Sequence, residues 1–228
     1  MLAHGIDNIE FPHHHTRAMM NGILLENHYD FVERVHHRND IVVDDELKAF
    51  SKKEGKTKKV TFLQGGVDNA YEMTPTMNAV FLIRHMSTHF ASETIPLRML
   101  YDWALFLQFY SKDVEWSLAK RIYEQSYMLI FVGIIQQILR SHLDYECHDC
   151  PLEFGNEKEA EKVWNSMIYH PRQNPHEENT IKYHIFEAGV FFSNRWKYKI
   201  AYPKESFFML FLHHLYGGVR ALIFKHRV

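Results

Sequence analysis

The sequence predicts an α+β fold, in which a small antiparallel β-rich N-terminal part precedes a larger α-helical bundle. Two observations support this prediction. Asn21-Gly22 is the strongest short-range signal for a two-residue hairpin turn, and segments that can form strands flank it. After residue 74 the apolar residues recur with the 3.6-residue period of helices. The change of pattern predicts two domains, residues 1–73 and 74–228.

The predicted hairpin covers residues 9–31. Side chains alternate between the two faces of a strand, so Glu26 and His28 share one face. A carboxylate inside a strand is unfavourable for β-structure, which leaves two interpretations of Glu26, a solvent-facing residue or a functional group. Asp44 or Asp45 is predicted to begin a short helix that ends at Phe50, and residues 60–64 are predicted to form a short strand.

Seven helices are predicted in the second domain. The first begins at Pro75 with Thr74 as its N-cap, because the first helical position needs no backbone N–H. Another begins at Asn156, whose spacing to Glu159 fits a capping box. The predicted ranges are 75–90, 95–110, 114–126, 127–143, 156–169, 177–200 and 204–225.

The first two of these helices each carry a polar pair four residues apart, His85 with His89 and Arg98 with Asp102. Residues at this spacing are neighbours on one helix face. We expect both helices to be buried and the two pairs to form a hydrogen-bonded centre. Three roles stay open for the histidines: bonding to the backbone or to Asp102, binding a metal, or contacting a substrate. Arg98 either pairs with Asp102 or contacts a phosphate or an acceptor.

Composition excludes several classes of function. The 26 basic and 28 acidic residues give a net charge of −2, without the basic excess typical of nucleic-acid binders. Cys147 and Cys150 are the only cysteines, which favours a reducing compartment, and we expect a cytoplasmic protein. The N-terminal residues do not resemble a signal peptide, and the apolar run 206–224 is interrupted by histidine, glycine and arginine. We therefore expect a packed terminal helix and no membrane span.

Several segments, taken in order, resemble one protein family. They are GILLENHYDF at 22–31, LIRHMSTHF at 82–90, LRMLYDWALFL at 97–107 and DVEWSLAKR at 113–121. They resemble the uncharacterised nucleotidyltransferase family of the polymerase-β-like superfamily. In that family an acidic residue followed two positions later by histidine lies on a strand, and a histidine-pair helix and an Arg-x-x-x-Asp helix follow. The resemblance covers roughly residues 22–139.

The resemblance implies transfer of a nucleotidyl group from an NTP to an acceptor, with Mg²⁺ held by three carboxylates. It gives Glu26 and Arg98 catalytic roles and makes Glu26 and His28 metal ligands. It places His85, His89 and Asp102 in the nucleotide cleft.

Two of the three family carboxylates, a D-x-[DE] pair after a glycine turn, are not found. Gly65-Gly66 is not followed by such a pair, and Asp44-Asp45-Glu46 comes after Glu26. One carboxylate cannot hold two magnesium ions. The resemblance therefore implies a C-terminal portion of such a protein, either a shortened gene product or a divergent member, in which residues 1–73 are the remnant of the family's larger sheet. We expect that this chain does not transfer nucleotides by itself.

Two alternatives remain. The first is a non-catalytic helical interaction module that forms a homodimer through an exposed sheet edge. The second is a metal-dependent hydrolase that uses His85 and His89.

Overall fold

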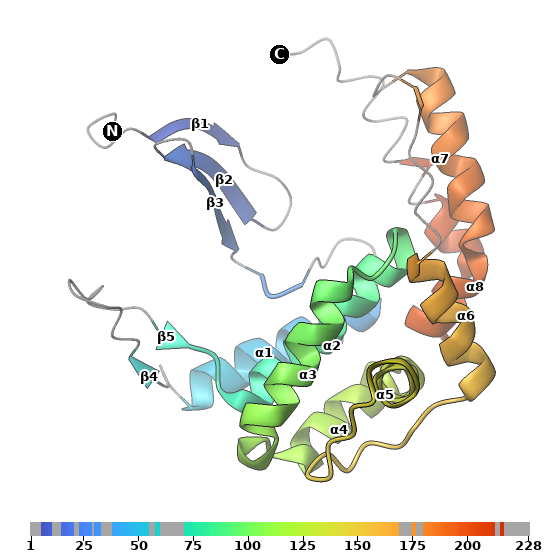
Figure 1. Cartoon of the computed structure of the whole chain (residues 1–228). Helices are drawn as coiled ribbons and strands as arrows, with labels where there is room; N and C mark the ends of the chain where they lie inside the picture. Colours follow the sequence, from blue (N-terminus) through green and yellow to red (C-terminus); the bar gives the residue numbers. More distant parts are fainter. Residues whose placement is uncertain are drawn as a thin grey trace. The chain divides into compact units, whose positions relative to one another are not determined.

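The structure is a computed structural model, and it describes residues 6–10, 15–20, 23–28, 30–32, 38–54, 58–59, 71–168, 175–176, 180–212 and 215–216. The chain divides into two compact units, residues 1–72 and residues 73–228 (Figure 1).

The described residues of the first unit form two small antiparallel sheets and one helix. Strands β1 (Ile6–Glu10), β2 (His15–Met20) and β3 (Ile23–His28) form the larger sheet in the order β1-β2-β3. Met20 pairs with Ile23, so only two residues connect β2 to β3, and the predicted hairpin pairing is confirmed. Strands β4 (Lys58–Lys59) and β5 (Tyr71–Glu72) form the second sheet. The strand predicted at 60–64 lies outside the described residues.

The predicted α+β fold with a β-rich N-terminal part is wrong, because helices form most of the described chain. The longest element of the first unit is itself a helix, the 17-residue α1 (Arg38–Glu54). The sequence analysis expected only a short helix from Asp44 or Asp45. Its start was missed because the buried face of α1 contains aspartates: Asp40 and Asp44 are buried together with Val43 and Leu47. Apolar residues recurring at the helical period do not reveal a buried face that contains aspartates.

The second unit is helical throughout its described length, apart from connecting segments. Thr74 caps α2 (Pro75–Ser92) through a 3.2 Å bond from the Met77 N–H to its hydroxyl, as predicted. Helix α3 (Leu97–Tyr110), a 3₁₀ turn (Ser111–Asp113), α4 (Trp116–Gln125), α5 (Leu129–Leu143) and α6 (Glu157–Ile168) follow. Then come α7 (Ile181–Ser193), α8 (Arg195–Ala201) and further helical residues at 207–212 and 215–216.

The single helix predicted over 177–200 is two helices. Asn194 lies at the junction of the two helices. Its N–H donates to the Val190 carbonyl of α7, and its own carbonyl accepts the Lys197 N–H of α8. Apolar residues continue through both helices, so their period did not reveal the break.

The core of the second unit surrounds α5, in which every residue from Phe131 to Leu139 is buried. Helices α3, α4, α6 and α8 all contact α5. A charged group also lies in the core: Arg84 of α2 is fully buried, and its guanidinium lies 4.4 Å from the centre of the Tyr202 ring. Desolvation strengthens such cation–π contacts to about 2 kcal/mol. Among the described helices, none is long and apolar enough to cross a bilayer.

Candidate functional site

The structure places Glu26 and His28 on β3, in the sheet of the first unit. Within this sheet Glu26 is paired with Arg17, and His28 is paired with His15. The predicted metal-binding carboxylate therefore occupies a strand position directly opposite a cationic residue, and cross-strand partners of opposite charge attract. The side chains of Glu26 and His28 lie outside the described part of the structure, so their roles stay predictions.

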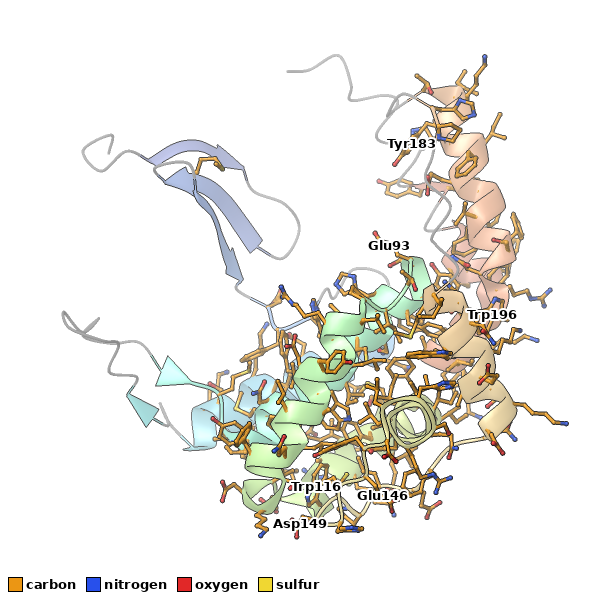
Figure 2. The ribbon with its side chains drawn as sticks, in the orientation of Figure 1. Glu93, Trp116, Glu146, Asp149, Tyr183 and Trp196 are labelled. Carbon is orange, nitrogen blue, oxygen red and sulfur yellow. The ribbon has the colours of Figure 1, made fainter. Side chains whose placement is uncertain are left out.

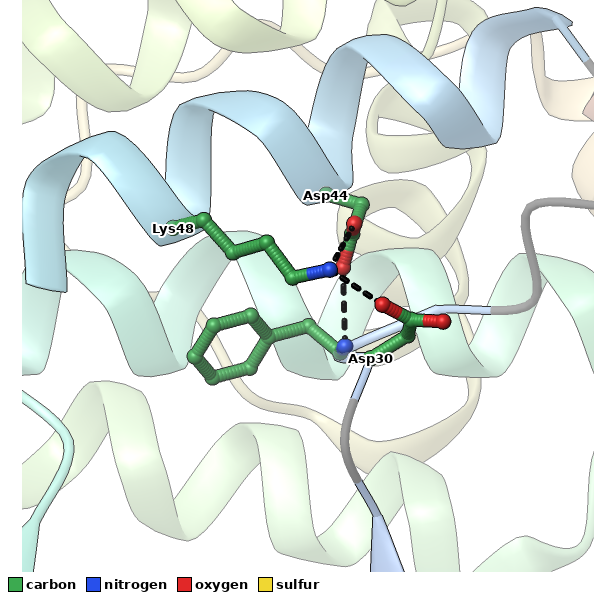
Figure 3. A network of polar contacts seen from close by, with 4 residues as sticks. Asp30, Asp44 and Lys48 are labelled. Carbon is green, nitrogen blue, oxygen red and sulfur yellow. Dashed lines mark hydrogen bonds and ion pairs between the residues drawn. The ribbon is translucent and has the colours of Figure 1, made fainter. Parts of the chain in front are cut away.

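A polar network ties the segment after β3 to α1 (Figure 3). The Asp44 carboxylate accepts the Phe31 N–H at 2.9 Å and the Lys48 ammonium at 2.8 Å, and Lys48 also donates to Asp30. These hydrogen bonds, first to Asp30 and then to Asp44, raise the pKa of Lys48 above its usual 10.5. The network fixes the chain two residues beyond His28. The sequence analysis missed it, although the four-residue spacing of Asp44 and Lys48 was a signal for an ion pair.

His85 and His89 are neighbours on α2. Their ring centres are 4.7 Å apart and the rings are nearly perpendicular, at 86°. On the other side His85 stacks on Phe81, with 5.6 Å between ring centres. The predicted shared face is confirmed. His85 is exposed and His89 is half-buried, so this row of rings lies at the surface of α2 and not in the core.

Arg98 and Asp102 form the predicted ion pair on α3, with 3.6 Å between Arg98 Nε and Asp102 Oδ2. The expected hydrogen-bonded centre between two buried helices is wrong, since the side chains of Arg98 and Asp102 are 88% and 49% exposed. Within the described chain Asp102 pairs with Arg98 and with neither histidine. The apolar residues of α3 face the core through Leu100, Trp103 and Leu107, which turns Arg98 and Asp102 toward solvent.

The described residues do not fit a magnesium centre of the kind that nucleotidyl transfer uses. Nowhere in the described chain do three His, Cys, Asp or Glu side chains come together in a group that could hold a metal ion. Asp44 begins the acidic run Asp44-Asp45-Glu46, but its buried carboxylate already binds Lys48 and the Phe31 N–H. A metal ion there would have to displace the Lys48 ammonium.

Comparison with known proteins shows what this chain is similar to. Residues 1–142 match the family described as "Uncharacterised nucleotidyltransferase". The chain belongs to this nucleotidyltransferase family. The resemblance inferred from residues 22–139 is confirmed. No curated protein and no solved structure matches the chain.

In this nucleotidyltransferase-family chain a groove of about 750 Å³ lies between α4, α5, α6 and α8. Its lining includes residues within the family match, on α4 and α5, and residues after position 142. Buried Val132, Gly133, Leu152 and Ile200 line it. Trp196 projects from α8 toward α6, and Lys162 lies 4.0 Å from its ring centre (Figure 2). Further charged residues of the lining are Lys120, Glu124, Glu153, Glu159 and Lys199.

Of the predicted site residues whose side chains the structure describes, none lines this groove: His85, His89, Arg98 and Asp102 all lie outside it. The sequence did not reveal the groove, because its lining is spread over residues 120–200, on four helices and the segment before α6, without a shared motif.

The two cysteines of this family member lie in the connection between α5 and α6. Both are free and half-buried. Burial raises the pKa of the Cys150 thiol to about 12, so at neutral pH Cys150 is a thiol and a weak nucleophile.

Proposed function

We propose that this chain takes part in nucleotidyl transfer from an NTP to an acceptor, and that it binds the NTP with Mg²⁺ but does not catalyse the transfer by itself. The family match over residues 1–142 carries the proposal. The limit to binding comes from the sequence, in which Glu26 resembles one family carboxylate and no D-x-[DE] pair follows a glycine turn to supply the other two.

Transfer of a nucleotidyl group requires a protein to hold a triphosphate in place and to balance its negative charge. Arg98 is suited to this task. Its guanidinium is exposed and its contact with Asp102 is long, at 3.6 Å. Exposed ion pairs contribute only about 0–1 kcal/mol, so exchanging Asp102 for a phosphate oxygen costs little. Arginine also presents a planar fork of donors that matches phosphate geometry.

His85 and His89 are proposed to border the same nucleotide. Imidazole can donate or accept a hydrogen bond near neutral pH, and the edge-to-face contact between the two rings holds their orientation. Asp102 is proposed to position Arg98.

Calorimetric titration with ATP, GTP, CTP and UTP, each with and without Mg²⁺, tests binding. We expect Mg²⁺-dependent binding that is lost in Glu26→Gln and weakened in Arg98→Ala. Lys158→Ala, which removes an exposed basic residue of α6, is the matched control and should bind like the wild type. No binding of any NTP would contradict the proposal.

A pyrophosphate-release assay tests the limit to binding. We expect no release above the protein-free background with any of the four nucleotides. Release that persists after extensive purification and disappears in Glu26→Gln would show that the chain is active by itself.

We also propose a cytoplasmic location, on the ground that both cysteines are free thiols. Subcellular fractionation tests it.

A further inference from the structure

Helix α7 exposes a stripe of apolar residues along its length. Ile181 and Ile185 are 69% and 68% exposed, and Phe192 is about half exposed. With Ala188 they follow spacings of four, three and four residues, which place them on one face of the helix. A face of this kind is normally buried against another element.

The helical residues 207–212 and 215–216 add to this apolar surface. Phe208, Met209, Leu212, Leu215 and Tyr216 are all exposed, and Phe208 and Leu212 share one helix face by their spacing of four residues.

Phe192 joins the two stripes. Its ring centre lies 4.8 Å from that of Phe211 and 5.8 Å from that of Phe207. The neighbouring Phe191 stacks on Phe207 at 4.9 Å. The two helices are therefore held together by aromatic contacts, and each keeps an apolar stripe outside the contact.

The size of this surface suits a protein interface. With about 200 Å² for each large side chain, the exposed fractions of the eight large apolar residues amount to roughly 900 Å². A standard interface buries about 800 Å² on each partner. The exposed apolar stripe of α3, which runs through Leu97, Tyr101, Leu105 and Phe109, reaches about half of that area by the same reckoning.

The chemistry of the surface favours an identical partner. A patch with charges needs opposite charges across the interface, whereas an uncharged apolar patch is complementary to itself, as a two-fold dimer requires. No charged residue lies in the α7 stripe, and α7 as a whole contains only Lys182 and Glu187 as charged side chains. Helices that lie on membranes usually carry a polar face rich in lysine and arginine, and α7 lacks one.

We propose that the exposed face of α7 together with residues 207–212 and 215–216, the α7 face, is the contact surface of a symmetric dimer of this chain. The dimer contact lies on these helices and not at the sheet edge. It is independent of nucleotide binding.

Sedimentation velocity of the full chain, at loading concentrations from about 1 to about 100 µM, tests the proposal over the range of weak specific interfaces. The wild type should reach twice its mass of 27.2 kDa. Ile185→Glu and Phe208→Glu should each raise the dimer Kd at least tenfold, because each would place a charge in a dry interface. Phe109→Glu, at a residue of α3 that is 68% exposed, is the matched control and should leave the dimer unchanged.

Gly189→Lys separates a loss of dimer contact from a loss of folding. Gly189 lies on α7 beside the stripe, and a Cβ there would meet no atom within 4 Å. The substitution should therefore leave the far-UV circular dichroism spectrum unchanged and still weaken the dimer.

Three results would overturn the proposal. A monomeric wild type at the highest concentration would do so. So would a dimer that Ile185→Glu, Phe208→Glu and Gly189→Lys all leave intact, since its contact would then lie elsewhere. The third is a monomer that floats with phosphatidylcholine–phosphatidylserine vesicles and loses this binding in Ile185→Glu, which would identify the α7 face as a lipid-binding surface.

Discussion

The N–H of Gly155 donates to the carbonyl oxygen of Gly133 at 2.8 Å, so the segment before α6 lies against the backbone of α5. A Cβ on Gly155 would lie 2.6 Å from the Gly133 carbonyl carbon and from the Ile134 nitrogen. Both are backbone atoms of a buried helix and cannot move aside separately. The absence of a side chain at Gly155 is thus what lets this segment form one wall of the groove between α4, α5, α6 and α8.

Gly155→Ala should destabilise the chain. Because the added methyl group meets backbone atoms, the segment must move away from α5, and overpacking of this kind costs about 1–3 kcal/mol. Urea unfolding followed by circular dichroism measures the change in the free energy of unfolding. Gly189→Ala is the control: its Cβ meets nothing, and alanine favours the helix by about 0.8–1 kcal/mol over glycine. If Gly155→Ala had the same urea midpoint of unfolding as the wild type, the close approach of Gly155 to the backbone of Gly133 would be wrong.

Removal of Lys48 should destabilise the first unit, in a way that depends on pH. Lys48→Met deprives the fully buried Asp44 carboxylate of the Lys48 ammonium, and the loss of such a charged hydrogen-bond partner costs about 1–3 kcal/mol. The pKa of Lys48 is raised in the folded state, so its contribution is complete below the unfolded pKa of 10.5 and is lost as pH rises through the folded value. The difference in unfolding free energy between wild type and Lys48→Met should stay constant up to about pH 10 and shrink above it. Lys52→Met, at an exposed position of the same helix, is the control and should show neither effect.

Lys197 should give the opposite dependence on pH. Its side chain is buried in α8 and its ammonium donates to the Glu93 carbonyl at the end of α2. Burial lowers the pKa of Lys197, although Glu93 acts in the other direction. The unfolded chain therefore binds more protons between the lowered pKa and 10.5, so stability should rise with pH across that window.

Urea unfolding of the wild type and Lys197→Met across this window measures the effect. Relative to the variant, the wild type should gain stability as pH rises. The exposed Lys199 of the same helix supplies the control variant, Lys199→Met. A difference between wild type and Lys197→Met that did not change with pH would show that Lys197 is solvated.

The sequence predicted the helices of the second unit well because their ends carry local signals. The Thr74–Pro75 cap and the Asn156 cap need no tertiary contact, and both are present. The pairing of β2 with β3 was equally local, since two residues connect them. Helix α1 was predicted too short because Asp40 and Asp44 occupy its buried face. A buried aspartate is favourable only with polar partners; Asp44 has Lys48 on the same helix and the Phe31 N–H, which comes from outside the helix.

The site was predicted less completely than the fold. The four-residue spacing correctly predicted that His85 and His89 share one face of α2. It left two roles open for Arg98, and the structure shows the pair with Asp102. It did not determine which way each face points. That direction depends on which residues of α3 are buried. Leu100, Trp103 and Leu107 face the core, so Arg98 faces solvent. The groove beside Trp196 depends on the contact of Gly155 with Gly133 across more than twenty residues, which no local pattern contains.

The exposed position of Arg98 allows its role in binding to be separated from any role in stability. Arg98→Ala and Asp102→Ala should each change the free energy of unfolding by less than about 0.5 kcal/mol, because a surface pair at 3.6 Å is screened by solvent. A double-mutant cycle of the two substitutions, measured by urea unfolding at low and high salt, should give a coupling of about 0–0.5 kcal/mol that falls with salt. Any loss of NTP affinity in Arg98→Ala would then reflect a missing contact with the nucleotide and not a damaged fold. A coupling above about 1 kcal/mol would instead show that the pair stabilises α3, and Arg98 would be a structural residue.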